Sequence, residues 1–263
     1  AIHGDELNGI EIIRRLLAAV DPALLRGVLI AVPIVNVFGF VNESRYLPDR
    51  RDLNRSFPGS TRGSLAARLA DLFMSEIVAL CGVGVDFHTG SDGRFNTPQV
   101  RADMNDPDTR RLAEAFGAPL LVQAKLRDGS LREAAAAKGV RILLFEGGEA
   151  GRIDEDVVAT GVEGTLRLMA ALDMIDGEFV PPIEPVRVRK TRWVRARRSG
   201  TALMRTRPGV RVQQGEVVAE IHDPMRARPT VVKSPESGIV VGCSVSGLVN
   251  QGDALVNLGL VEA

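Results

Sequence analysis

The chain has 263 residues, 45% hydrophobic and 25% charged, a composition typical of a soluble globular protein that buries a substantial core. Its 33 basic residues balance 33 acidic residues, so the overall charge indicates neither nucleic acid nor a membrane as a partner, and no apolar run is long enough to span a bilayer. Cys81 and Cys243 lie far apart, which argues against a disulfide framework and favours a reducing compartment, so we expect a cytoplasmic protein.

The first residues already carry a candidate metal ligand, because His3 follows Ala1 almost at once. A ligand usually depends on a strand that leads into its loop, and no such strand precedes His3. We therefore expect that an N-terminal strand of the catalytic domain is missing from this sequence.

Helix-like and strand-like runs alternate over the first two-thirds of the chain. In chain order we predict a helix over 10–20, a buried strand over 27–37, a helix over 65–77, a strand over 83–87, a helix over 107–116, a helix from Ser130 to Gly139, a strand over 140–145 and a helix over 153–172. Ser64 and Ser130 are placed to cap helices, and Gly117 is placed to end one.

This alternation predicts an α/β domain over residues 1–180, with a mixed, largely parallel sheet and flanking helices. His88 follows one predicted strand and Glu146 follows another. Open α/β sheets place their ligand sites at the carboxyl ends of parallel strands. We therefore expect these two side chains to lie near each other.

The pattern changes after Gly177, where Pro181, Pro182 and Pro185 indicate a linker. From residue 186 onward, short alternating runs are separated by glycines, and the stretch after Gly209 resembles the stretch after Gly247. Two similar hairpin halves predict a small all-β barrel or sandwich domain over 186–263.

Two of the three histidines lie in short segments that also carry acidic residues. His3, Glu6 and His88 offer two imidazoles and a carboxylate, a set that suits zinc. Three protein ligands leave a fourth position open, which is typical of catalytic sites, so we predict one Zn²⁺ per chain. Either Asp86 or Asp5 could orient a ligating imidazole, and the sequence does not choose between them.

Each of these signals is weak alone, since a histidine near a strand end is more often structural and the His-x-x-Glu spacing is common. A polar stretch over 42–59 strengthens them, because it holds the only tyrosine and a dense set of arginines and aspartates. Arginine binds carboxylates through its two-pronged guanidinium and can stabilise an oxyanion. The alternative is an ordinary surface loop.

Together, these segments resemble the succinylglutamate desuccinylase/aspartoacylase family, which belongs with the zinc carboxypeptidases. The matching motifs are 3–9, 45–46, 52–59, 86–90 and 146–148, and the β-rich tail is also similar to the family's C-terminal domain. The resemblance implies a zinc carboxypeptidase-like fold for the first domain.

The resemblance also implies roles for particular residues. His3, Glu6 and His88 would hold zinc, and Glu146 would act as general base and then as general acid. Arg45 would polarise the scissile carbonyl. Asn54 and Arg55 would bind the carboxylate of the substrate. The stretch over 89–101 is similar to a bacterial branch of the family that includes the N-acetyl-2,4-diaminobutyrate deacetylase. This second similarity implies further substrate contacts from Arg94, Asn96 and Arg101.

We therefore expect a metal-dependent amidohydrolase that removes the acyl group from a small N-acyl amino acid or related N-acyl amine, a linear amide rather than a peptide. One alternative is desuccinylation or carboxypeptidase-like cleavage of a short peptide. Another is a non-catalytic binding or carrier module, although the surroundings of Lys233 lack the usual carrier pattern. The tail is better suited to covering the mouth of the active site or to subunit contacts in a homo-oligomer.

Two further features have competing interpretations. A basic cluster over 187–198 encloses Trp193 and could bind single-stranded nucleic acid, but the zero net charge favours a solvated strand face. Glu149 lies close to Glu146 in the sequence, and we expect it to form a salt bridge or to cap the helix that follows.

Overall fold

The computed structural model describes residues 1–91, 93–177, 180–181 and 183–261, so Pro182 of the predicted linker lies outside the described residues. The helical elements are α1 (Asn8–Ala19), α2 (Val37–Val41), η1 (Leu53–Arg55), α3 (Leu65–Glu76), η2 (Val78–Leu80), α4 (Pro107–Phe116), α5 (Leu131–Ala136) and α6 (Glu155–Ala171). The strands are β1 (Val83–Gly90), β2 (Arg94–Ala102), β3 (Leu120–Gln123), β4 (Arg141–Glu149), β5 (Val186–Arg195), β6 (Gly200–Met204), β7 (Arg211–Val212), β8 (Val217–His222), β9 (Thr230–Lys233), β10 (Gly238–Ser244), β11 (Leu248–Val249) and β12 (Ala254–Val261).

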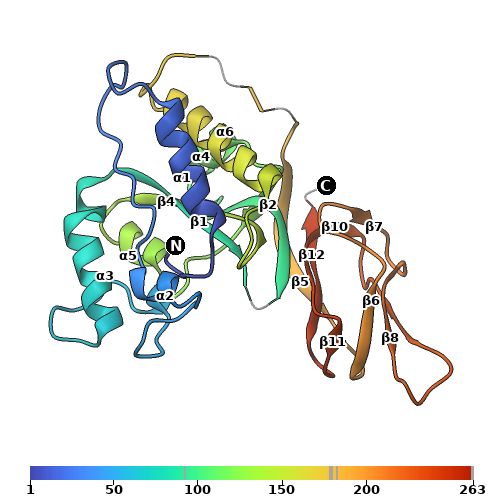
Figure 1. Cartoon of the computed structure of the whole chain (residues 1–263). Coiled ribbons are helices and arrows are strands. Elements are labelled where there is room, and N and C mark those ends of the chain that lie inside the picture. Colours follow the sequence, from blue (N-terminus) through green and yellow to red (C-terminus); the bar gives the residue numbers. More distant parts are fainter. Residues whose placement is uncertain (92, 178–179, 182, 262–263) are drawn as a thin grey trace.

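An eight-stranded sheet in the order β1-β4-β2-β3-β5-β12-β10-β7 runs through both halves of the molecule (Figure 1). The pairs β1–β4, β2–β3 and β3–β5 are parallel, whereas β2–β4 and β5–β12 are antiparallel. A second sheet has the order β11-β6-β8-β9. The predicted mixed α/β fold is therefore confirmed. No helix in the described part of the chain is long and apolar enough to cross a membrane.

Helices cover both faces of the first half of the large sheet (Figure 1). On one face, α1 and α4 pack against α6, and their core includes Phe87, Phe116 and Phe145. On the other face, α3 and α5 share a core with Leu53 and Phe57. This second core fixes the polar loop of residues 42–59 against the sheet, beside the carboxyl ends of β1 and β4.

The helices with clear local signals form where they were predicted. Ser64 caps α3 by accepting a hydrogen bond from the backbone N–H of Ala67. α4 begins at Pro107 and ends before Gly117, whose φ of 67° is the left-handed conformation that favours glycine at a helix C-terminus. α5 is shorter than predicted, since it ends at Ala136.

The predicted buried strand over 27–37 is wrong. This segment is extended but has no ladder partner among the described residues, and Val28 is 79% exposed. A strand needs a neighbour to satisfy its backbone N–H and C=O groups, so composition alone does not make one. β1 is the outermost strand of the sheet, and no described strand pairs with the edge that faces away from β4.

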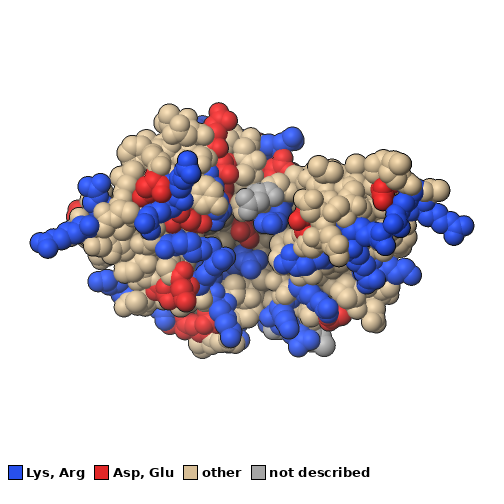
Figure 2. All heavy atoms as spheres, turned by 90° about the horizontal axis from the view of Figure 1, so that it is seen from below, with Lys and Arg blue, Asp and Glu red and all other residues tan. Residues whose placement is uncertain are grey.

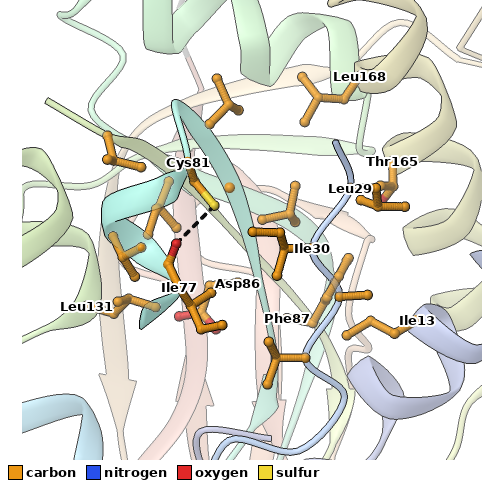
Figure 3. A pocket seen from close by; sticks show the side chains of 18 of the residues that line it. Ile13, Leu29, Ile30, Ile77, Cys81, Asp86, Phe87, Leu131, Thr165 and Leu168 are labelled. Atoms are coloured by element: carbon orange, nitrogen blue, oxygen red, sulfur yellow. Dashed lines mark hydrogen bonds between the residues drawn. The ribbon is translucent and has the colours of Figure 1, made fainter. Parts of the chain in front are cut away.

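A cavity of about 520 Å³ borders both β1 and this extended segment. Figure 3 shows its largely apolar lining, with Leu29 and Ile30 from the extended segment, Ile13 from α1 and Leu168 from α6. It borders the site described below through Asp86, the only carboxylate among the described residues of its lining.

β2 connects the two halves of the molecule. One of its edges pairs with β4, while its other edge pairs first with β10 through residues 94–96 and then with β3 through residues 99–102. The strands β2, β3, β5, β12 and β10 therefore form a closed ring, which is filled by Leu120, Val122, Val188, Ile239 and Val241. The division into two domains at 181–185 stays a prediction, while the sheet continues across it.

Candidate active site

Three buried side chains from distant segments meet beside the end of β1. His3 and Glu6 come from the loop before α1, and His88 comes from β1. The Nδ1 atom of His3 lies 2.8 Å from Oε1 of Glu6, and the Nδ1 atom of His88 lies 2.7 Å from Oε2 of Glu6. One ligand atom from each residue lies within 4.8 Å of the others. Two imidazole nitrogens and one carboxylate converging in this way fit a zinc ion.

The outer nitrogens of both imidazoles face carboxylates. Nε2 of His3 lies 3.2 Å from Oδ1 of Asp52, and Nε2 of His88 lies 2.9 Å from Oδ2 of Asp86. Such a partner holds the proton on Nε2 and leaves Nδ1 available to a metal. Of the two candidates named from the sequence, the structure places Asp86 in this role and not Asp5; the second orienting residue, Asp52, was missed.

The electrostatics of this cluster favour a positive charge at its centre. Burial alone would lower the pKa of His88, but attraction to Asp86 and Glu6 and hydrogen bonds with both raise it to about 10. Burial alone would likewise raise the pKa of Glu6, but His88 and His3 hold it well below its usual range. The carboxylates therefore stay ionised, and without a metal the cluster retains a proton on His88.

Glu146 lies beside His88, since the two residues are register partners in the parallel ladder of β1 and β4. Both residues lie inside these strands and not after them, because the ladder continues to Gly90 and Glu149. Nη1 of Arg101 is 3.8 Å from Oε2 of Glu146. The side chain of Glu146 is partly exposed, so it can exchange a proton with a bound molecule.

Arg45 reaches the metal-ligand cluster from the polar loop. Its guanidinium donates to Oδ2 of Asp52 at 2.8 Å and lies 3.6 Å from Oε1 of Glu6. Asp52 therefore holds both His3 and Arg45, and its pKa is held below the usual range because hydrogen bonds and attraction from His3 and Arg45 outweigh burial. This places a fixed cation directly beside the candidate metal site.

Asn54 and Arg55 follow Asp52 in η1. The side chain of Asn54 is buried and accepts a hydrogen bond from the backbone N–H of Leu131, which ties the polar loop to α5. Arg55 donates to the backbone carbonyl of Asn54. Burial lowers the pKa of Arg55, and the nearby Arg127 lowers it further.

A pocket of about 320 Å³ includes every residue predicted from the sequence as a metal ligand, a catalytic residue or a substrate contact. These residues are His3, Glu6, Arg45, Asn54, Arg55, His88, Arg94, Asn96, Arg101 and Glu146. Figure 2 shows the molecule from below, with Lys and Arg side chains around a hollow between its two halves. The structure therefore brings together residues that the sequence spreads over most of the first domain.

Sequence reasoning missed several pocket residues, namely Lys125, Arg127, Arg132, Thr191, Trp193 and Asn257. Arg132 is buried and donates to the backbone carbonyls of Arg101 and Lys125. Within the described ranges, no carboxylate lies within 4.0 Å of a charged nitrogen of Arg55, Lys125, Arg127 or Arg132. The pocket is therefore strongly cationic and suits an anionic ligand.

Comparisons with known proteins agree with this geometry. The family described as succinylglutamate desuccinylase/aspartoacylase catalytic domain matches residues 1–172. A curated relative, the N-alpha-acetyl-L-2,4-diaminobutyric acid deacetylase of Halomonas elongata, is 27% identical over 96% of this chain and 78% of its own length.

Two solved structures are similar to this fold along almost its whole length. The ectoine utilization protein EutE of Ruegeria pomeroyi, with product bound, has a TM-score of 0.89 at 26% identity and covers 99% of this chain and 83% of its own. A succinylglutamate desuccinylase/aspartoacylase from Rhodobacter sphaeroides has a TM-score of 0.88 at 29% identity and covers 99% of this chain and 84% of its own.

Proposed function

Because this chain belongs to the succinylglutamate desuccinylase/aspartoacylase family, we propose that it is a zinc-dependent deacylase that hydrolyses the amide bond of a small N-acyl amino acid. The observation that carries the proposal is the convergence of His3, Glu6 and His88, with Glu146 in the same pocket. The deacetylase activity in the name of the Halomonas relative supports the same class of reaction.

His3, Glu6 and His88 would hold the zinc, with Asp52 and Asp86 fixing the two imidazoles. When bound, zinc supplies Lewis acidity, which lowers the pKa of water toward about 7 and polarises a carbonyl. The remaining chemistry belongs to side chains of this chain.

Glu146 moves the proton. Its carboxylate takes a proton from the attacking water as the new C–O bond forms, and the resulting carboxyl group gives that proton to the amide nitrogen as the C–N bond breaks. The guanidinium of Arg45 lies beside the metal ligands and stabilises the negative charge that develops on the carbonyl oxygen. The products are a carboxylic acid and a free amine.

The carboxylate of the substrate binds the cations that border the pocket. Burial and then repulsion from the nearby Arg127 lower the pKa of the Arg55 guanidinium, and an anion bound between the two arginines relieves that repulsion. Asn54 supports this arrangement through its bond to Leu131. Arg94 and Arg101 border the remainder of the pocket.

A second candidate is removal of a succinyl group. It is favoured by Arg55, Lys125, Arg127 and Arg132, which have no carboxylate neighbour among the described residues, because a succinyl substrate brings a second carboxylate into the pocket. Cleavage of a short peptide is supported by no comparable observation.

The proposal is tested by metal analysis and a substrate screen. The purified protein is loaded with zinc and assayed with N-acetyl, N-succinyl and N-formyl amino acids, with and without a chelator. We expect one zinc per chain and turnover that stops on chelation and returns with zinc. A zinc-loaded protein that binds these compounds but hydrolyses none of them would instead be a binding module.

A further inference from the structure

The wall of the pocket that comes from the second half of the chain carries three side chains, Thr191 and Trp193 of β5 and Asn257 of β12. We call these residues the β wall. Trp193 and Asn257 are direct register partners in the antiparallel β5–β12 ladder, so their side chains stand side by side on the same face. Thr191 and Trp193 are two positions apart and share that face.

The β wall is fixed firmly to the catalytic sheet. β12 pairs with β10, and β10 pairs with the beginning of β2, where Gly242 is opposite Asn96. A Cβ atom on Gly242 would lie only 2.2 Å from Oδ1 of Asn96, so glycine permits this close approach. Because the ring of strands is closed and filled, the β wall keeps a constant position relative to Glu146.

The order of strands shows which end of a substrate meets the β wall. His88 lies on β1, Glu146 on the adjacent β4 and Arg101 on β2, whereas the β wall lies farther along the same sheet on β5 and β12. Glu146 therefore stands between the metal ligands and the β wall. Since Glu146 protonates the departing nitrogen in the proposed reaction, the amine side of the substrate points toward the β wall.

Asn257 has a polar group that the fold leaves unused. The residue is 6% exposed, yet its Oδ1 atom has no hydrogen-bond partner among the described residues. Buried amides are normally paired, so an unpaired acceptor beside a pocket indicates a partner supplied by a ligand. The ring of Trp193, with the Arg94 guanidinium 5.3 Å from its centroid, provides a flat surface next to this acceptor.

We propose that Trp193 and Asn257 determine which amino acid the enzyme accepts, by contacting the side chain of the leaving amino acid. Asn257 hydrogen-bonds a donor group at the end of that side chain, and Trp193 packs along its stem. The preferred substrates are thus N-acyl derivatives of amino acids whose side chains end in an N–H donor. This inference rests on the proposed deacylase function.

The test compares N-acetylglutamine with N-acetylmethionine, whose side chains are similar in length and differ in the donor group. kcat/KM is measured for both in the zinc-loaded wild type and in Asn257→Leu, Trp193→Ala and the control Asn250→Leu, an exposed residue outside the pocket. We expect the wild type to prefer glutamine, and Asn257→Leu to reduce this preference about 10- to 100-fold. The control should keep the wild-type ratio.

A second pair of substrates, N-acetylglutamine and N-succinylglutamine, reports on the acyl side. The acetyl-to-succinyl ratio should stay within about twofold in both β-wall variants, because the β wall is on the amine side. The proposal would be overturned if the folded, zinc-loaded variants keep the wild-type ratio of kcat/KM for N-acetylglutamine and N-acetylmethionine. It would also be overturned if only the ratio for N-acetylglutamine and N-succinylglutamine changes. If Asn257→Leu does not fold, Asn257→Ser tests the same ratio. A wild type without turnover on any compound of the N-acetyl, N-succinyl and N-formyl screen overturns the deacylase function itself, and the β-wall proposal with it.

Discussion

His3 and Asp52 lie 49 positions apart in the chain, yet Nε2 of His3 is 3.2 Å from Oδ1 of Asp52. The other oxygen of the same carboxylate holds the guanidinium of Arg45 at 2.8 Å. One acidic side chain therefore sets the orientation of both a candidate zinc ligand and the cation that, in the proposed reaction, stabilises the carbonyl.

Replacing Asp52 with asparagine should weaken both functions. We expect zinc affinity to fall about 10- to 100-fold, because the imidazole of His3 loses its charged partner. Turnover should remain below wild type even at saturating zinc, since Arg45 is less firmly held. Chelator competition and kinetics measure the two effects. Asp49→Asn is the matched control. Asp49 lies in the same loop as Asp52 and accepts a hydrogen bond from the backbone N–H of Ala66 in α3, but it does not line the pocket. Equal losses of zinc affinity and turnover in both variants would contradict the role of Asp52.

Removal of His88 should abolish stoichiometric zinc binding. The His88→Ala variant lacks one of the three converging ligands, so zinc content measured by atomic emission should fall far below one per chain. His222→Ala is the control, because His222 ends β8 and lies near Glu220, outside the cluster. Full zinc content in His88→Ala would exclude His88 as a ligand.

Replacement of Glu146 separates chemistry from metal binding. Glu146→Gln should keep zinc and lower kcat by about 10²- to 10⁴-fold, because the amide can neither accept the proton of water nor pass it to the leaving nitrogen. Glu149→Gln should leave kcat within a few-fold of wild type, since Glu149 forms an ion pair with Arg152 at 2.6 Å. Near-normal turnover in Glu146→Gln would remove Glu146 from the mechanism.

Zinc affinity should depend steeply on pH. In the metal-free protein the pKa of His88 is raised to about 10, so a proton must leave whenever zinc binds at neutral pH. Apparent affinity should therefore rise about tenfold per pH unit between about pH 7 and 9. The same raised pKa stabilises the metal-free fold below the unfolded value of about 6.5, and this contribution is lost as the pH rises toward 10. Affinity that does not change over this range would show that His88 is already neutral.

The features predicted correctly from the sequence are those with local causes. The helix α4 begins at Pro107 and ends before Gly117, and both residues are local helix signals. Ser64 likewise caps the N-terminus of α3. The strand over 27–37 was predicted wrongly because pairing, and not composition, makes a strand, and no described strand forms a ladder with this segment. Strand ends depend on pairing as well, so the prediction that β1 and β4 end before His88 and Glu146 was wrong: the ladder extends past both residues.

Site residues, too, were predicted where the signal is local. His3 and Glu6 were found because they lie three positions apart in one short motif. Asp52 was noted only as part of a motif, since its contact with His3 depends on tertiary folding. Trp193 was assigned to a basic strand face, and the arginines around it do pair outward, with Arg192 2.8 Å from Glu236. The alternation of β5 turns Trp193 to the opposite side, toward the pocket.

The closed ring of strands also bears on how the protein is made. Of the described strands, β12 comes last along the chain, and it supplies Asn257 while also joining β5 to β10. During translation, the candidate metal ligands and Glu146 leave the ribosome long before residues 254–261. A nascent chain can thus assemble its helices and the first strands early, but its binding pocket stays incomplete until β12 is released and inserts between β5 and β10.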